Sequence, residues 1–116
     1  MGYRSEVLLI VGKEVMPLFL TAMATESEAK DLCFRYRDHC EKDYGEMGSL
    51  LFSWTYLKWY DSFDSVAAIE NFMDLCDTED LEEHYRFVRI GEDTSDTEER
   101  GFFAECSANI CRAINW

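Results

Sequence analysis

The chain has 116 residues and carries 24 acidic against 11 basic side chains, a formal net charge of −13. This length suits one domain, and a composition that is 47% hydrophobic and 15% aromatic supplies a packed core, which excludes disorder for most of the chain. The acidic balance disfavours direct binding to free nucleic acid and to anionic lipid, because both are negatively charged themselves.

The chain begins with a predicted strand and a short helix. A continuous apolar stretch predicts a buried central strand over about residues 3–11, which Gly12 ends. Apolar residues then recur at helical spacing over residues 14–24 and predict a short helix there. Pro17 fits the first turn of this helix, where its missing N–H costs no hydrogen bond.

A second, longer helix is predicted from Thr25 onwards. Thr25 and Glu28 have the spacing of a capping box, in which each side chain bonds to the backbone N–H of the other residue. The apolar residues that follow form one helical stripe: Ala29, Leu32, Cys33, Tyr36 and Cys40. The pattern also places His39 among charged residues on the polar side of this helix.

The middle of the chain predicts an aromatic strand and a third helix. Apolar residues alternate with polar ones over most of residues 49–60, which is typical of a strand with one buried face. The alternation changes phase near residues 56–58, which indicates either a bulge or burial of both faces at that point. The next helix is expected to start within residues 61–65 and to end at Thr78, or to continue there for one short extra turn.

The C-terminal part predicts more strands than helices. Residues 85–90 predict a third strand, which Gly91 closes. Residues 92–100 are expected to form an acidic loop, and the tail of residues 101–116 to add one or two short strands, for example over 110–115.

The resulting order β-α-α-β-α-β-β predicts a single α+β domain over residues 1–116. We expect a two-layer sandwich, with three helices packed on a mixed or antiparallel sheet of about four strands. The chain contains no internal repeat and no stretch rich in Pro or Gly that would mark a linker.

The acidic residues are concentrated in the second half of the chain. Residues 61–116 carry 15 acidic and 4 basic side chains, and residues 77–99 alone carry ten carboxylates against two arginines. This excess is explained either by a solvated, solubilising face or by a docking surface for a basic partner. Carboxylates three or four residues apart on a helix have a separation comparable to that of successive phosphates, so such rows can imitate a nucleic-acid backbone.

Under the docking interpretation, eleven carboxylates are candidate partner-binding residues: Asp74, Asp77, Glu79, Asp80, Glu82, Glu83, Glu92, Asp93, Asp96, Glu98 and Glu99. Trp59, at the end of the aromatic strand, is a further candidate for an interface or pocket.

Catalytic and metal-binding patterns are weak, and no catalytic residue, metal ligand or cofactor is predicted. The two histidines, His39 and His84, have no nearby nucleophile motif. The cysteines are odd in number and include no CxxC pair, so they are expected to be core residues or free thiols in a reducing compartment: Cys33, Cys40, Cys76, Cys106 and Cys111. The acidic loop lacks the central glycine and the ligand spacing of an EF-hand.

Two alternatives to acidic docking remain open. A small ligand-binding or enzymatic domain could use a pocket near Trp59 and Tyr60, with Arg86 and Arg89 binding an anion, unless these arginines only neutralise the carboxylates around them. An accessory protein that forms a homodimer, through a sheet edge or through the tail ending at Trp116, is the other alternative.

The sequence contains no predicted export or membrane signal. The early apolar run over residues 7–11 is shorter than the apolar region of a signal peptide and far shorter than a membrane span. A cytoplasmic location is therefore expected.

Three blocks of sequence resemble a known group of proteins. The opening residues 1–7 (MGYRSEV), residues 58–62 (KWYDS) and residues 85–93 (YRFVRIGED) are similar to a family of small, largely uncharacterised proteins of tailed bacteriophages. This resemblance implies an accessory phage protein that acts inside an infected bacterium, and it brings no assigned reaction.

By analogy of size and charge with anti-CRISPR and other anti-defence proteins, the expected role is inhibition of a host nucleic-acid-handling defence complex. The expected partner is a basic host protein or ribonucleoprotein, and neither direct binding to nucleic acid nor binding to a membrane is expected.

Overall fold

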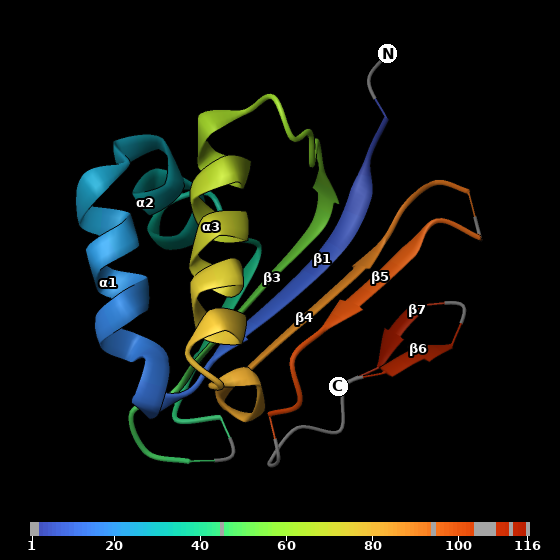
Figure 1. Cartoon of the computed structure of the whole chain (residues 1–116). Helices are drawn as coiled ribbons and strands as arrows, with labels where there is room; N and C mark the ends of the chain where they lie inside the picture. Colours follow the sequence, from blue (N-terminus) through green and yellow to red (C-terminus); the bar gives the residue numbers. More distant parts are fainter. Residues whose placement is uncertain (1–2, 45, 94, 104–108, 112, 116) are drawn as a thin grey trace.

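The chain folds as an α+β structure in which three α-helices cover one face of an antiparallel sheet (Figure 1). This computed structural model describes residues 3–44, 46–93, 95–103, 109–111 and 113–115. Over these ranges the main sheet has five strands in the spatial order β2-β3-β1-β4-β5, and two further strands form a separate hairpin. The predicted fold class is confirmed, with five strands in the main sheet rather than about four.

The elements follow one another along the chain with short connections. The strands are β1 (Ser5–Val11), β2 (His39–Lys42), β3 (Leu50–Leu57), β4 (Tyr85–Ile90), β5 (Thr97–Arg100), β6 (Asn109–Cys111) and β7 (Ala113–Asn115). The α-helices are α1 (Met16–Thr25), α2 (Ser27–Phe34) and α3 (Asp64–Thr78), and the 3-10 helices are η1 (Lys13–Val15) and η2 (Glu82–His84).

Strand β1 is the central strand of the sheet, as its apolar sequence predicts. It pairs with β3 on one side and with β4 on the other. Leu9 belongs to the core beneath the helices, whereas Leu8 and Ile10 belong to a second cluster with Phe103 on the opposite face. The β6–β7 hairpin lies against β1 and β4. Because both faces of β1 are covered, the strand has no need of polar alternation.

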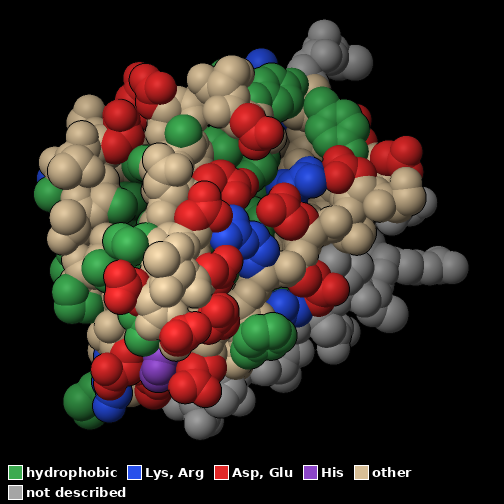
Figure 2. All heavy atoms as spheres, in the orientation of Figure 1, with side chains coloured by type: hydrophobic (Ala, Val, Ile, Leu, Met, Phe, Trp, Pro, Cys, Tyr) green, Lys and Arg blue, Asp and Glu red, His purple; other side chains and the backbone are tan. Residues whose placement is uncertain are grey.

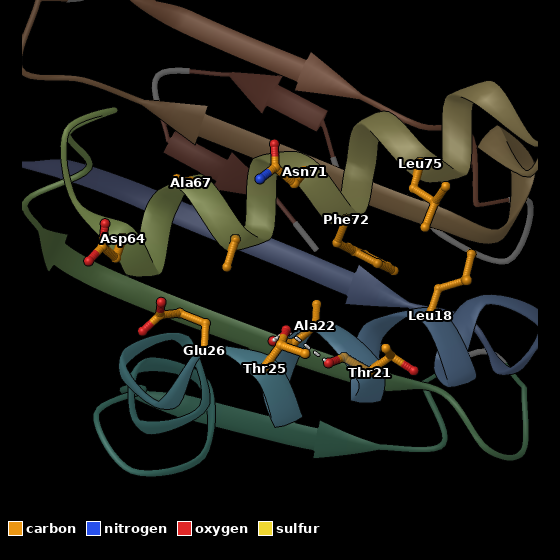
Figure 3. Close-up of a pocket in the computed structure, with 11 residues that line it drawn as sticks. Leu18, Thr21, Ala22, Thr25, Glu26, Asp64, Ala67, Asn71, Phe72 and Leu75 are labelled. Carbon is orange, nitrogen blue, oxygen red and sulfur yellow. Dashed lines mark hydrogen bonds between the residues drawn. The ribbon is translucent and has the colours of Figure 1, made fainter.

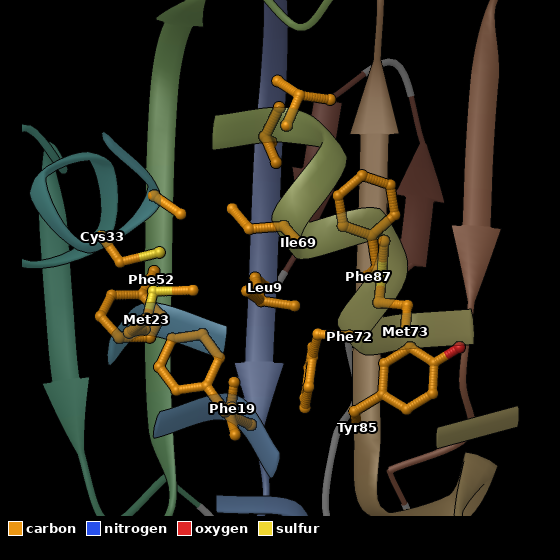
Figure 4. Close-up of a cluster of buried hydrophobic side chains, with 14 of the residues drawn as sticks. Leu9, Phe19, Met23, Cys33, Phe52, Ile69, Phe72, Met73, Tyr85 and Phe87 are labelled. Atoms are coloured by element: carbon orange, nitrogen blue, oxygen red, sulfur yellow. The ribbon is translucent and has the colours of Figure 1, made fainter. Parts of the chain in front are cut away.

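An aromatic cluster joins the helices to the sheet (Figure 4). The ring centroid of Phe19 on α1 lies 5.7 Å from that of Phe52 on β3 and 5.4 Å from that of Phe72 on α3. These rings are buried and tilted against one another, a favourable arrangement for aromatic pairs. The cluster fixes α1 and α3 relative to the sheet.

The predicted irregularity of the aromatic strand is a shift of register against β1. Ser5 pairs with Leu57, but Val7 pairs with Trp54, so β3 has one more residue than β1 between these two pairs. The extra residue lies between Trp54 and Leu57, next to the predicted positions 56–58, and the expected bulge is confirmed.

The predicted long helix from Thr25 to Cys40 is wrong in its second half. Helix α2 ends at Phe34, and Cys40 lies in β2, an edge strand that pairs with β3. The Asp38 carboxylate accepts hydrogen bonds from the backbone N–H (2.6 Å) and the hydroxyl (3.0 Å) of Thr55, which anchors the turn to the sheet. Pairing with β3 thus outweighs the local helical period.

The predicted capping box is also wrong. The Thr25 hydroxyl donates to the carbonyls of Thr21 and Ala22 within α1. Glu26 caps α2 instead, because its carboxylate accepts the backbone N–H of Glu28 at 3.2 Å. Helix α1 therefore continues to Thr25 and α2 begins at Ser27, whereas the sequence pattern predicted that one long helix starts at Thr25.

The predicted acidic loop over residues 92–100 is correct only in its first part. Residues Thr97–Arg100 form β5, which pairs with β4, and the backbone N–H of Gly91 donates to the carbonyl of Asp96 to close the hairpin. Charged residues can occupy this strand because it lies at the edge of the sheet, where it is exposed to water along one side.

Over the ranges that the structure describes, no helix is both long and apolar enough to cross a membrane.

Candidate functional site

The acidic residues of the second half gather over α3, the turn that follows it, and the β4–β5 hairpin (Figure 2). We call this surface the acidic face, and it comprises Glu70, Asp74, Asp77, Glu79, Asp80, Glu82, Glu83, Glu92, Asp93, Asp96, Glu98 and Glu99. Three arginines lie among these twelve carboxylates, Arg86, Arg89 and Arg100, so the formal charge of the face is −9.

Helix α3 places its carboxylates on one side through simple periodicity. Glu70, Asp74 and Asp77 follow one another at spacings of four and three residues, which keeps them on one side of the helix. Ile69, Met73 and Cys76, each directly before one of these carboxylates, are buried against the sheet. The amphipathic pattern of α3 therefore turns this row of carboxylates towards the edge strand β5.

Arg100 on β5 joins the edge strand to this row. Its guanidinium Nη1 lies 3.0 Å from Glu70, and Nη2 lies 2.8 Å from both Asp74 and Asp77. Tyr85 adds to the cluster, because its hydroxyl donates to Asp77 at 2.7 Å. Burial, followed by this hydrogen bond, raises the pKa of Tyr85, so the phenol stays protonated. The carboxylates of α3 are thus held in fixed positions.

The other two arginines bridge β4 and β5. Arg86 lies 2.5 Å from Glu99, and Arg89 lies 2.8 Å from Asp96 and 3.3 Å from Glu98. The hydrogen bond from Arg89 is the main cause of the lowered pKa of the Asp96 carboxyl. An anionic ligand at these arginines would have to compete with these carboxylates, and the ligand-binding role remains a prediction.

Six of the predicted docking residues form no ion pair with an arginine or lysine side chain among the described residues: Glu79, Asp80, Glu82, Glu83, Glu92 and Asp93. The first four lie in and after the turn that ends α3, and the last two lie in the β4–β5 turn. Asp80 has a left-handed backbone conformation, with φ of 59°. Asp93 accepts hydrogen bonds from the backbone and hydroxyl of Ser95, and these lower its pKa.

Trp59 is a core residue rather than an exposed docking residue. Its side chain is 8% exposed, and its ring centroid lies 5.3 Å from that of Phe87. Its indole N–H donates to Glu70 at 3.3 Å. Trp59 and Tyr60 nevertheless line a hollow of about 390 Å³ at the upper end of the acidic face, together with Asp61. Trp59 therefore contributes to the site by forming part of the wall of this hollow.

Glu70 and Arg100 are the two site residues that the sequence reasoning missed. Glu70 contacts both Arg100 and Trp59, and its pKa is raised, chiefly by burial and next by the nearby Glu98 carboxylate. The four-residue spacing between Glu70 and Asp74, which places both on one side of a helix, was the sequence pattern that could have identified Glu70. Arg100 gave no such signal, because the segment that contains it was expected to be a loop.

The described part of the chain contains no group of three or more histidine, cysteine or carboxylate side chains arranged to hold a metal ion. His39 lies in the edge strand β2, whereas His84 ends η2. Burial raises the pKa of both Cys33 and Cys76 to about 12, so these thiols are protonated at neutral pH. The chemistry that dominates the described surface is therefore charge.

Comparisons with protein-family models, with curated proteins and with solved structures gave no match to this chain. The fold and the site together define an antiparallel α+β protein with a strongly negative surface whose central carboxylates are held in place by arginines.

Proposed function

We propose that this protein is a non-enzymatic binding protein whose acidic face docks on a basic surface of another macromolecule. The proposed partner is a basic host protein or ribonucleoprotein of a nucleic-acid-handling defence complex. The protein would then act in the cytoplasm of an infected bacterium as an anti-CRISPR-like, phage-encoded inhibitor.

The observation that carries this proposal is the charge of the acidic face. Its twelve carboxylates exceed its three arginines, which leaves a formal charge of −9 over one helix and one hairpin. Concentrated charge of this kind steers a basic partner towards the face and raises the association rate. In the rest of the chain twelve acidic side chains stand against eight basic ones, so most of the excess negative charge is concentrated on this face, which a uniformly solubilising surface would not require.

The arginines support the proposal in a second way, because they fix carboxylates without neutralising the face. Arg100 holds Asp74 and Asp77 on a single nitrogen, so both side chains have lost rotamer freedom before any partner binds. Binding then costs less side-chain entropy than it would with freely moving carboxylates. A fixed row of negative groups is also what a groove built for phosphates recognises.

A displacement assay tests the proposal on purified defence complexes. A labelled oligonucleotide is bound to a CRISPR effector, and its release is followed by fluorescence anisotropy as the protein is added. We expect release at low salt and a loss of affinity of roughly tenfold or more when salt is raised several-fold, because interactions between exposed charges are screened.

A matched pair of variants locates the effect on the molecule. Glu79→Gln with Glu83→Gln removes two exposed charges from the acidic face, whereas Glu28→Gln with Glu41→Gln removes two exposed charges from α2 and from β2 at the opposite sheet edge. We expect weaker displacement from the first variant only. Equal activity of both variants, or displacement that does not depend on salt, contradicts the proposal.

A further inference from the structure

A groove of about 400 Å³ runs between helices α1 and α3 on the outer side of the helical layer (Figure 3). Figure 3 shows Leu18 and Leu75 at one end of this groove and Glu26 and Asp64 at the other. Phe72 lines the groove at its apolar end. The groove therefore has an apolar end and an acidic end.

Small side chains make room for this groove between the two helices. Ala22 on α1 and Ala67 and Ala68 on α3 line it, and none of them fills the space between the helix axes. Leu75 remains 42% exposed at its edge, although it is a large apolar residue. The described residues that line the groove come from α1, from α3 and from Glu26, which caps α2.

The groove adjoins the acidic face across the width of one helix. Ala67 and Asn71 line both the groove and a second hollow of about 410 Å³, whose other walls are Asp61, Glu70 and Glu98. A single partner element lying along α3 can therefore contact apolar side chains on one flank and carboxylates on the other.

We infer that this groove receives an amphipathic, basic α-helix of the partner. The apolar side chains of that helix enter the groove between α1 and α3, and its lysines or arginines contact the carboxylates of the adjoining hollow. The inference rests on the proposed function, and it names the part of the basic partner that the acidic face recognises.

The dimensions of the groove fit a helix of about three turns. The positions from Asp64 to Leu75 cover about 16 Å of helix α3 at 1.5 Å per residue. A partner helix that lies along this length presents apolar residues at spacings of three, four and seven, which is the usual pattern for a helix bound in a groove.

Charge complementarity selects a basic helix rather than a second copy of this chain. Glu26 and Asp64 close one end of the groove, and Asp61, Glu70 and Glu98 line the hollow beside it. Two copies that packed through this surface would bring these carboxylates together in a complex of chains that each carry −13. A helix with lysines or arginines beside its apolar stripe relieves this repulsion instead.

Three 18-residue helical peptides test the inference by fluorescence anisotropy with the full-length protein. The first has leucines at helical spacing and lysines elsewhere, the second replaces the leucines by alanines, and the third replaces the lysines by glutamates. We expect the leucine–lysine peptide to bind roughly tenfold or more tightly than either of the others, which corresponds to about 1.4 kcal/mol.

Variants assign the binding to the groove. Asn71→Lys adds a positive charge on the wall shared by groove and hollow, and we expect it to weaken binding of the leucine–lysine peptide roughly fivefold. Leu75→Gln removes an apolar wall and is expected to have a similar effect. The control is Met47→Lys, which adds the same charge at an exposed position between β2 and β3 and is expected to leave the affinity unchanged.

Each possible outcome decides between the two proposals. Equal binding of the leucine–lysine and alanine–lysine peptides overturns the groove while leaving the acidic face intact as a docking surface. Equal binding of the leucine–lysine and leucine–glutamate peptides overturns the basic partner helix and counts against the proposed function as well. A dimer of the protein alone, seen by sedimentation and dissociated by Leu75→Gln, shows that the occupant is a second copy and also overturns the inference.

Discussion

Replacing Arg100 by methionine is the most direct test of how the acidic face is held together. The substitution keeps an aliphatic side chain of similar length but removes the guanidinium that contacts Glu70, Asp74 and Asp77. Three carboxylates are then left close together without their shared cation. We expect a loss of stability from repulsion and from the hydrogen bonds that disappear.

The expected magnitude follows from the exposure of the four side chains. Arg100 is 18% exposed, and its partners range from 25% for Glu70 to 67% for Asp74. Breaking a fully buried ion pair costs about 3–5 kcal/mol, whereas an exposed pair contributes at most about 1 kcal/mol. For this partly buried cluster we expect a loss of about 2 kcal/mol, or about 8 °C in Tm for a domain of this size.

Urea unfolding followed by tryptophan fluorescence measures this loss, because Trp54 and Trp59 are both buried. The loss should narrow as the pH falls from 7 to 4. The pKa of Glu70 is already raised in the folded protein, so protonation favours the folded state, and it does so more strongly once Arg100 is absent. Arg35→Met, at an exposed arginine after α2, is the matched control and should change stability by less than about 0.5 kcal/mol.

An effect of Arg100→Met no larger than that of Arg35→Met would refute the reasoning, as would a loss that does not change with pH. Either result would mean that the carboxylates of α3 do not depend on Arg100 for their positions.

Three further predictions follow from individual contacts. Because Arg89 lowers the pKa of Asp96, the stability that Asp96 contributes is present above its ordinary pKa of 3.8 and is lost as the pH falls through its lower pKa in the folded protein; the difference in Tm between wild type and Asp96→Asn should therefore be largest at pH 7 and should shrink as the pH falls below 3.8. Gly101→Ala should destabilise the protein by at least about 2 kcal/mol in urea unfolding, because φ is +79° and the added Cβ would meet the backbone carbonyl of Tyr85. An unchanged free energy of unfolding would contradict this backbone conformation of Gly101. Phe19→Ala should cost about 3–5 kcal/mol in the same assay, and a cost below about 1 kcal/mol would show that its aromatic cluster is loosely packed.

Local sequence patterns predicted the elements whose side chains bury a single regular face. The strand at residues 85–90 and helix α3, with its end at Thr78, were predicted closely, because period and boundary residues agreed. The helix at 14–24 was predicted as well, although its first turn is a 3-10 helix. In these segments the side chains that are buried in the folded protein are those that the local hydrophobic period predicts to be buried.

The two edge strands were missed for a common reason. Residues 39–42 continue a helical stripe and residues 97–100 are mostly charged, so neither segment has the alternation of a half-buried strand. Each becomes a strand because its backbone pairs with the neighbouring strand across a loop, β2 with β3 and β5 with β4. Strand formation of this kind depends on hydrogen bonds between segments, which no local period reports.

The candidate site likewise combines residues that the sequence predicted with contacts that it did not predict. The sequence alone identified the acidic segments and all but one of the carboxylates of the acidic face, because charge is a property of composition. It did not identify Arg100 as the residue that joins Glu70, Asp74 and Asp77, since that cluster requires β5 to lie beside α3. It also gave Trp59 as a candidate for an interface or a pocket; packing against Phe87 buries most of its ring, and the part that remains lines a hollow beside Tyr60.

The fold class, the central position of β1 and the strongly negative second half of the chain can be read from local sequence alone. These properties follow from hydrophobic period and from charge count, which act over a few residues. Tertiary packing, in contrast, places the carboxylates on one face, lets arginines hold five of the eleven predicted ones, and leaves an apolar groove beside them. Those features arise between α3 and its neighbours β5 and α1, where side chains from distant parts of the sequence meet.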